Sequence, residues 1–221
     1  MAITRDDVVN DRIRERMRAE GRGGQILSEE QFHQSRVEVL KAFDNCDELW
    51  IFGYGSLIWS PTFEFVESTV AHLQGCSRKF CLWAHTGRGS PEQPGLWLGL
   101  DTGGSCTGVA WRVDNAARDY ETLMLWRREM ISGAYTATVM PVMINGRERP
   151  CICLLANKSH ERYAGVVPRE QIIQCIATAD GHLGTCREYL FNLIDKLDEM
   201  KVPDPELHTL AHEVRRYRGE T

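Results

Sequence analysis

The stretch Leu49-Trp-Ile-Phe-Gly-Tyr-Gly-Ser-Leu-Ile-Trp59 contains no charged side chain, and its hydroxyl groups are those of Tyr54 and Ser56. The run before the first glycine is aromatic, aliphatic and β-branched, which predicts a buried strand that leads into a tight turn. Two glycines flank Tyr54 and permit backbone conformations that other residues avoid. A turn of this kind exposes backbone N–H groups, which can hold a carboxylate or a polarised carbonyl oxygen.

The length and composition of the chain predict one globular domain with a real core. The chain has 221 residues, of which 43% are hydrophobic and 26% are charged. Its formal net charge of −5 argues against binding to nucleic acid through a basic surface, whereas an anionic small molecule is compatible with it.

The start of the chain and its cysteines predict a cytoplasmic location. The segment from Met1 to Asp7 lacks the apolar core of a secretory signal, and no run approaches the roughly 20 apolar residues that span a bilayer. We therefore expect no membrane contact. The eight cysteines are expected to be free thiols, mostly buried, because the reducing cytosol disfavours disulfides.

The first 46 residues predict an N-terminal helical extension that packs on a main domain at residues 47–221. Residues 5–20 alternate acids and arginines around a thin apolar stripe, which is typical of a solvated helix. After a flexible joint at Gly21-Arg-Gly-Gly24, Ser28-Glu-Glu-Gln31 matches a capping box and predicts the start of a second helix.

The main domain predicts an α+β fold in which a small, closed or nearly closed mixed β-barrel is surrounded by helices. One helix, expected over residues 115–131 with Asp114 as its cap, interrupts the strands. We expect turns at Asp101-Thr-Gly-Gly104 and at Asn145-Gly146, the second being a strong hairpin signal. Strands are expected at 69–73, 78–84, 96–100, 107–113, 136–144 and 151–156, and helices at 168–179 and 185–200. After a break at Pro203-Asp-Pro205, a last short helix is marked by Leu207, Leu210, Val214 and Tyr217.

Glu129 is the acidic residue that most suggests chemistry. It lies near the end of the helix at 115–131, between Arg128 and Met130, so apolar neighbours would desolvate its carboxylate and raise its pKa. A solvated glutamate is the alternative interpretation. The segment Ser132-Gly-Ala-Tyr135 follows at once and predicts a second small-residue turn. A desolvated carboxylate that faces backbone donors can act as a general base beside an oxyanion pocket.

The sequence matches neither the dinucleotide-binding motif nor the motif of a serine hydrolase nucleophile. Gly53-Tyr-Gly55 is reminiscent of the dinucleotide fingerprint, but Ile58 stands where the third glycine is required and no helix follows. Gly-Tyr-Gly-Ser-Leu does not match G-x-S-x-G, so Ser56 is not expected to be a hydrolase nucleophile.

The cysteine and histidine spacing does not predict a metal site. Cys151-Ile-Cys153 places two thiols on one strand face, and His182 lies four residues before Cys186. Zinc sites usually show two paired knuckles, and the second pair is missing here. We therefore expect no metal site.

Taken together, these motifs resemble the ChaC family of γ-glutamylcyclotransferases, the glutathione-degrading type. The opening signature of that family matches Phe52 to Leu57 with Trp59, and its Arg-Glu pair matches Arg128-Glu129, followed by Gly133-Ala-Tyr135. The resemblance covers about residues 47–200. It implies a small mixed β-barrel with helices around it, which makes residues 47–221 the catalytic domain, and a reaction without a cofactor.

The resemblance also implies the reaction and its residues. The α-amine of glutathione would attack its own γ-carbonyl, giving 5-oxoproline and cysteinylglycine, with Glu129 as general acid and base. The substrate would bind at the turn formed by Phe52, Gly53, Tyr54, Gly55, Ser56 and Leu57, while Arg78 and Arg88 are candidates for the glycine carboxylate, although surface solvation is the alternative for both. A cyclotransferase for other γ-glutamyl amino acids or amines, and a non-catalytic γ-glutamyl-binding module, are the competing hypotheses.

Overall fold

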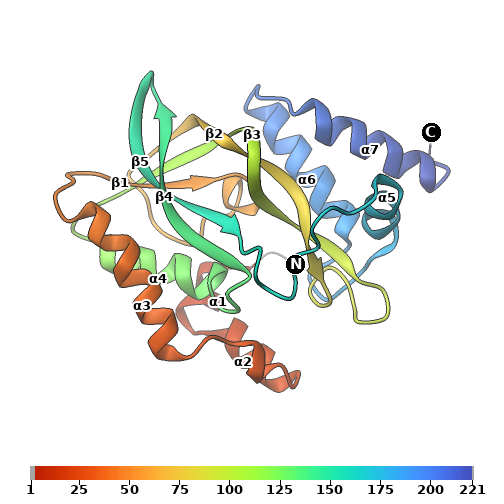
Figure 1. Cartoon of the computed structure of the whole chain (residues 1–221), viewed down its shortest axis with the longest axis horizontal. Helices are drawn as coiled ribbons and strands as arrows, with labels where there is room; N and C mark the ends of the chain where they lie inside the picture. Colours follow the sequence, from red (N-terminus) through yellow and green to blue (C-terminus); the bar gives the residue numbers. More distant parts are fainter. Residues whose placement is uncertain (1–2, 221) are drawn as a thin grey trace. The chain divides into compact units, whose positions relative to one another are not determined.

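The computed structural model describes residues 3–220 (Figure 1). These residues form two compact units. The barrel unit comprises residues 3–77 and 102–157, and the helical unit comprises residues 78–101 and 158–220. Residues 3–46 therefore belong to the same compact unit as most of the barrel strands; the functional boundary expected at residue 47 stays a prediction.

Five strands form a closed barrel, in the order β1-β3-β2-β4-β5. Strand β1 pairs antiparallel with β3, with Phe52 opposite Ala110, and parallel with β5, with Ile51 opposite Ile152. The expected α+β fold with a mixed barrel is therefore confirmed. The strands are β1 (Leu49–Gly53), β2 (Glu67–Ala84), β3 (Gly95–Val113), β4 (Tyr135–Ile144) and β5 (Arg147–Ala156).

Two of the expected strand boundaries are wrong. The segments at 69–73 and 78–84 are one strand, β2, and those at 96–100 and 107–113 are one strand, β3. The turn expected at Asp101–Gly104 lies inside β3, where Gly103 and Gly104 have φ of 95° and 76°. These glycines supply left-handed backbone within a continuing strand, as glycines at β-bulges do. The Asn145-Gly146 hairpin is confirmed, since both residues have positive φ between β4 and β5.

Helix α4 (Arg118–Glu129) carries the predicted catalytic glutamate at its last position. It begins later than expected, because Asp114 is not its cap. The Asp114 carboxylate instead accepts the Ala116 N–H at 3.0 Å, and Ala117 occupies the N-cap position. Asp114 thus stabilises a turn ahead of the helix. Tyr120 is 49% exposed, and Met124, Leu125 and Trp126 lie on the buried face of the helix.

The helical unit contains three helices that end the chain: α5 (Arg169–Thr178), α6 (Cys186–Glu199) and α7 (Pro205–Tyr217). Thr185 caps α6 in a reciprocal box with Glu188, and Asp204 caps α7. The apolar residues at helical spacing in α6 and α7 are buried, except that Tyr217 is exposed. Among residues 3–220, no helix is long and apolar enough to cross a membrane.

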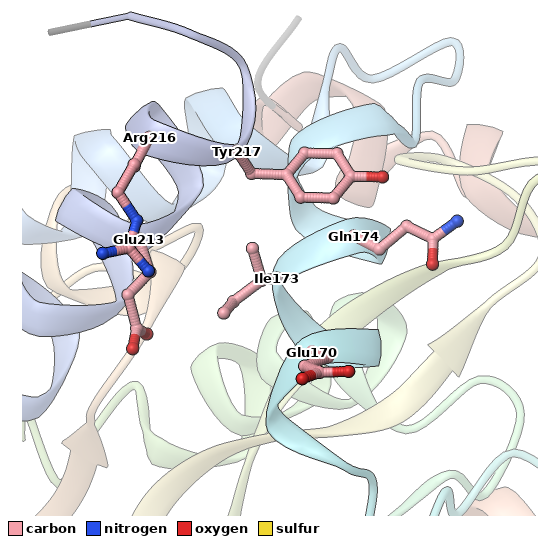
Figure 2. A pocket seen from close by; sticks show the side chains of 6 residues that line it. All are labelled: Glu170, Ile173, Gln174, Glu213, Arg216 and Tyr217. Carbon is pink, nitrogen blue, oxygen red and sulfur yellow. The ribbon is translucent and has the colours of Figure 1, made fainter.

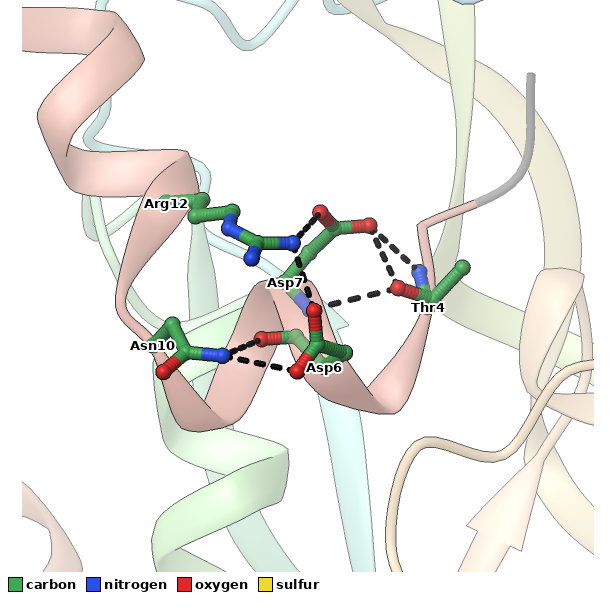
Figure 3. A network of polar contacts seen from close by, with 5 residues as sticks. All are labelled: Thr4, Asp6, Asp7, Asn10 and Arg12. Carbon is green, nitrogen blue, oxygen red and sulfur yellow. Dashed lines mark hydrogen bonds and ion pairs between the residues drawn. The ribbon is translucent and has the colours of Figure 1, made fainter.

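The N-terminal segment contains two short helices where one was expected, α1 (Arg5–Val9) and α2 (Arg12–Ala19). Asp11 interrupts them with a φ of 53°, a left-handed conformation that aspartate tolerates better than most residues. Helix α3 (Glu29–Leu40) begins at Ser28 with the predicted capping box. Figure 3 shows the polar contacts at α1, where the Thr4 side chain and Asp7 form a further capping box.

Helix α1 is held to the rest of the barrel unit by a part-buried ion pair. The Arg5 guanidinium binds the Glu121 carboxylate through two nitrogens, at 2.7 and 2.8 Å. The Glu121 side chain is only 4% exposed and also accepts the Glu64 N–H at 2.7 Å. Arg5 donates in addition to the carbonyl of Thr62 at 2.9 Å. A bidentate pair of this kind is fixed geometrically as well as electrostatically.

We expect Arg5→Ala to lower the free energy of unfolding by about 2–3 kcal/mol, because it leaves the Glu121 carboxylate buried without its cation. Arg12→Ala is the matched control, since Arg12 pairs with Asp6 in a contact whose side chains are 50% and 66% exposed (Figure 3). It should cost less than about 1 kcal/mol. Urea unfolding measures both values, and equal losses would contradict this account of α1.

Candidate active site

The predicted substrate turn lies where β1 ends. Phe52 and Gly53 are the last residues of β1, and a single helical turn, η3 (Ser56–Ile58), follows. The side chains of Phe52, Tyr54 and Leu57 are 0%, 7% and 5% exposed. Ser56 is half-buried and is the most accessible residue of the motif. The large side chains of the motif are therefore packed inside the protein and hold the turn in place.

Gly53 is required by close packing and not by an unusual φ. Neither Gly53 nor Gly55 has a positive φ, contrary to the expected use of these glycines. A Cβ at Gly53 would lie 3.1 Å from both Leu57 Cβ and Trp111 Nε1. The space beside this glycine is thus filled by the protein, which draws β1, the turn and β3 together.

The last N–H groups of the turn are already used inside it. Ile58 N–H donates to the carbonyl of Gly55 at 2.8 Å, while the N–H groups of Trp59 and Ser60 donate to the carbonyl of Ser56 at 3.3 and 3.0 Å. Donors for a bound ligand must therefore come from earlier in the turn.

One guanidinium joins the turn to the predicted base. Arg128 Nη2 donates to Ser56 Oγ at 2.8 Å, Arg128 Nη1 donates to the carbonyl of Ser60, and Arg128 Nε lies 2.9 Å from Glu129 Oε1. The Arg128 side chain is 5% exposed. The structure thus brings Ser56 and Glu129 together through a residue that the sequence analysis named only as part of a motif. No local pattern could have found this contact, since Ser56 and Arg128 are 72 residues apart.

Glu129 has the environment expected of a tuned base. Its side chain is 17% exposed, so the carboxylate is largely desolvated yet remains reachable. Burial raises its pKa above the usual glutamate range, and the positive charge of Arg128 opposes that rise. The negative end of α4 acts in the same direction as burial, because Glu129 is the last residue of the helix. A carboxylate whose pKa is raised in this way binds a proton more readily than a solvated one, which suits a general base that must also return the proton.

The small-residue turn after Glu129 is also present. Gly133 has a φ of 73°, and its carbonyl accepts the side-chain amide of Asn157 at 2.9 Å. The N–H of Asn157 donates to the carbonyl of Ala134 at the same distance. These contacts tie the end of α4 to the end of β5.

Arg78 and Arg88, the candidates for the glycine carboxylate, both have partners within the protein. Both lie in the helical unit, where Arg78 Nη1 binds Asp204 Oδ2 at 2.7 Å and Arg88 Nη1 donates to the carbonyl of Thr185 at 2.7 Å. The Arg88 guanidinium lies over the Tyr189 ring, and burial lowers its pKa. Surface solvation, the alternative interpretation, is wrong for both, because each is packed against protein.

Burial disfavours the thiolate form of several cysteines. All eight are free, and six of them are buried, as predicted. Burial raises the pKa of Cys81 and Cys151 to about 12 and that of Cys186 to about 11, so these thiols are protonated at neutral pH. Within residues 3–220, no group of three or more histidine, cysteine and acidic side chains could hold a metal ion.

A hollow of about 390 Å³ lies in the helical unit between α5 and α7 (Figure 2). It contains none of the predicted site residues. Its Glu213 carboxylate is bound by Arg169 at 2.7 Å, and Ile173 points from α5 toward α7. Its lining consists of Glu170, Ile173, Gln174, Glu213, Arg216 and Tyr217.

The closed mixed barrel with its surrounding helices is a γ-glutamylcyclotransferase-type fold. A crystal structure of a γ-glutamyl cyclotransferase specific to glutathione from yeast superposes with a TM-score of 0.69, covering 77% of this chain and 97% of that one at 20% identity. The family model described as ChaC-like protein matches residues 49–217. The chain therefore belongs to the ChaC-like family.

Named relatives span most of the chain. A protein of Escherichia coli (strain K12) named glutathione-specific gamma-glutamylcyclotransferase is 37% identical over 196 residues, which is 88% of this chain and 85% of that protein. Gamma-glutamylcyclotransferase 2-1 of Arabidopsis thaliana is 33% identical over 76% of this chain and 82% of its own length.

We expect Gly53→Ala to lower the free energy of unfolding by about 1–3 kcal/mol, because the added methyl group must displace Leu57 or Trp111. Gly24→Ala is the control, since nothing lies within 4 Å of a Cβ built there. Its effect should stay within about 0.5 kcal/mol. Denaturant unfolding of the two variants tests this, and a neutral Gly53→Ala would refute the close packing of the turn.

Proposed function

We propose that this protein is a γ-glutamylcyclotransferase that converts glutathione into 5-oxoproline and cysteinylglycine. The observation that carries the proposal is the single guanidinium that joins Glu129 to the Phe52–Leu57 turn. Membership of the ChaC-like family supports it, as do the relatives named for this activity.

The proposed reaction needs one proton-transfer group. The α-nitrogen of the γ-glutamyl residue forms a bond to the γ-carbonyl carbon, and the bond from that carbon to the cysteine nitrogen breaks. Glu129 takes a proton from the α-ammonium group, which frees its electron pair, and passes it to the leaving nitrogen. The second proton that the α-nitrogen loses on becoming the lactam N–H also goes to the leaving nitrogen, so cysteinylglycine departs with an ammonium group. Because nucleophile and electrophile belong to one molecule, the protein has only to fold the substrate into the attacking geometry.

The turn is proposed to bind the γ-glutamyl end of the substrate. The N–H groups of residues 58–60 donate within the turn, so those of Gly55, Ser56 and Leu57 are the proposed donors to the α-carboxylate or to the developing oxyanion. Phe52, Gly53 and Tyr54 form the supporting wall, since their side-chain positions are buried.

Two alternatives predict different behaviour with substrates. A cyclotransferase for other γ-glutamyl amino acids or amines would prefer a γ-glutamyl dipeptide that lacks the terminal glycine. A non-catalytic binding module would be stabilised by glutathione without forming product. The desolvated Glu129 favours catalysis over binding alone, because a buried carboxylate would repel the carboxylates of the ligand.

We also propose a cytoplasmic setting in which a small molecule, and not nucleic acid, is the partner. The free thiols suit a reducing compartment, and the net charge of −5 disfavours a polyanion.

Purified protein incubated with glutathione should release 5-oxoproline and cysteinylglycine in equal amounts. Glu129→Gln keeps the shape of the side chain and removes the base, so kcat should fall about 10²–10⁴-fold. Chromatography with mass detection measures both products. The base assignment fails if folded Glu129→Gln turns over glutathione at the wild-type rate.

Glu48→Gln is the control variant, because Glu48, like Glu129, is a glutamate that contacts an arginine. Glu48 pairs with Arg149 on the barrel, and its side chain is 34% exposed. Because this pair lies outside the proposed site, its loss should leave kcat unchanged. Equal losses in Glu48→Gln and Glu129→Gln would mean that Glu129 has only a structural role.

A further inference from the structure

We propose that Arg128 is a positioning residue that fixes the Glu129 carboxylate relative to residues Ser56 to Ser60, a segment that overlaps the Phe52–Leu57 turn. This inference rests on the proposed function, because it assumes that Glu129 is the base and that the turn holds the substrate. It assigns a specific task to a residue that touches the base and the turn at once.

The first step is the geometry of the guanidinium. Each of its three nitrogens has a separate partner: Nε lies 2.9 Å from Glu129 Oε1 in an ion pair, Nη2 donates to Ser56 Oγ at 2.8 Å, and Nη1 donates to the carbonyl of Ser60. The group is planar and rigid, so these three acceptors are held at fixed positions relative to one another. A displacement of the base by about 1 Å costs about 10²-fold in rate, which gives this rigidity a catalytic purpose.

The second step is burial. The Arg128 side chain is 5% exposed, so its charge is poorly screened and its contacts exclude water. Arg128 is also the charged group that opposes the effect of burial on the pKa of Glu129. The contact between Arg128 and Glu129 therefore fixes the position of the carboxylate and also favours its ionised form.

The third step is the support behind the turn. The Ser60 hydroxyl donates to the carbonyl of Ile3 at 3.4 Å, and Arg5 binds the carbonyl of Thr62 at 2.9 Å. The N-terminal segment lies outside the family match at residues 49–217, yet it holds the loop that carries an acceptor of Arg128. The acceptor is thereby fixed from both sides.

Arg127 supplies a matched control. It precedes Arg128 in α4, carries the same charge, and donates to the carbonyl of Val9 at 2.9 Å in an exposed contact. Arg128→Gln should lower kcat about 10²-fold, while Arg127→Gln should leave it unchanged. Arg128→Lys should recover little of the loss, because an ammonium group cannot serve three acceptors in one plane.

The pH profile separates positioning from a general structural role. Without Arg128 the pKa of Glu129 rises further, so the acid limb of kcat/KM should move to higher pH in Arg128→Gln but not in Arg127→Gln. Carbon-13 NMR of side-chain-labelled glutamate, with the Glu129→Gln spectrum as the assignment reference, should show the same shift without substrate. If wild type forms no 5-oxoproline from glutathione, the proposed function fails, and this titration still tests the role of Arg128.

Ser56→Ala keeps the test decisive if Arg128→Gln does not fold. It removes one of the three acceptors and leaves the ion pair in place. We expect a several-fold fall in kcat with unchanged circular dichroism. Wild-type kcat in Ser56→Ala, or a folded Arg128→Gln with wild-type kcat and acid limb, would overturn the proposal.

Discussion

The contact between the Arg128 guanidinium and the Glu129 carboxylate is the interaction on which the proposed site depends. Neighbouring residues at the end of a helix normally point in different directions, and here the Arg128 guanidinium contacts both the Glu129 carboxylate and the turn that follows β1. Burial and the negative end of α4 both disfavour the charged carboxylate, whereas the buried cation favours it. Because these effects oppose one another, the Glu129 carboxylate can still ionise in a site that is mostly closed to water.

A buried ion pair of this kind is weak evidence for stability, since desolvation offsets much of the attraction between the charges. Its value here is geometric. The barrel brings β1 and the start of the turn beside β3, and α4 delivers Glu129 from a distant part of the sequence. Only a group with several donors in one plane can connect two such segments and hold them at a constant distance.

The sequence predicted the elements whose signals are local. The buried β1 strand, the Asn145-Gly146 hairpin and the Ser28 capping box depend on neighbouring residues alone, and all three are confirmed. The turn at Asp101–Gly104 is wrong because a glycine pair looks the same at a chain reversal and within a bulged strand. The pairing of neighbouring strands decides between them, and it is not visible in the local pattern.

The site was predicted in its parts but not in its connections. Glu129 and the Phe52–Leu57 turn were recognised from motifs, and the assignment of roles within them stays a prediction. The sequence did not reveal that Arg128 links them, that Gly53 serves close packing, or that Arg78 and Arg88 have partners elsewhere. Each of these facts depends on residues far apart in the chain, so only the fold could show them.

The most direct test of the account is the pKa of Glu129 in the wild-type protein without substrate. Side-chain carbon-13 NMR can follow its carboxyl group through a pH titration, with the spectrum of Glu129→Gln identifying the signal. The account predicts a midpoint above the ordinary glutamate value of 4.5, because burial outweighs the effect of Arg128. A midpoint at or below that value would show that the carboxylate is a solvated or fully paired group and would contradict its role as the base.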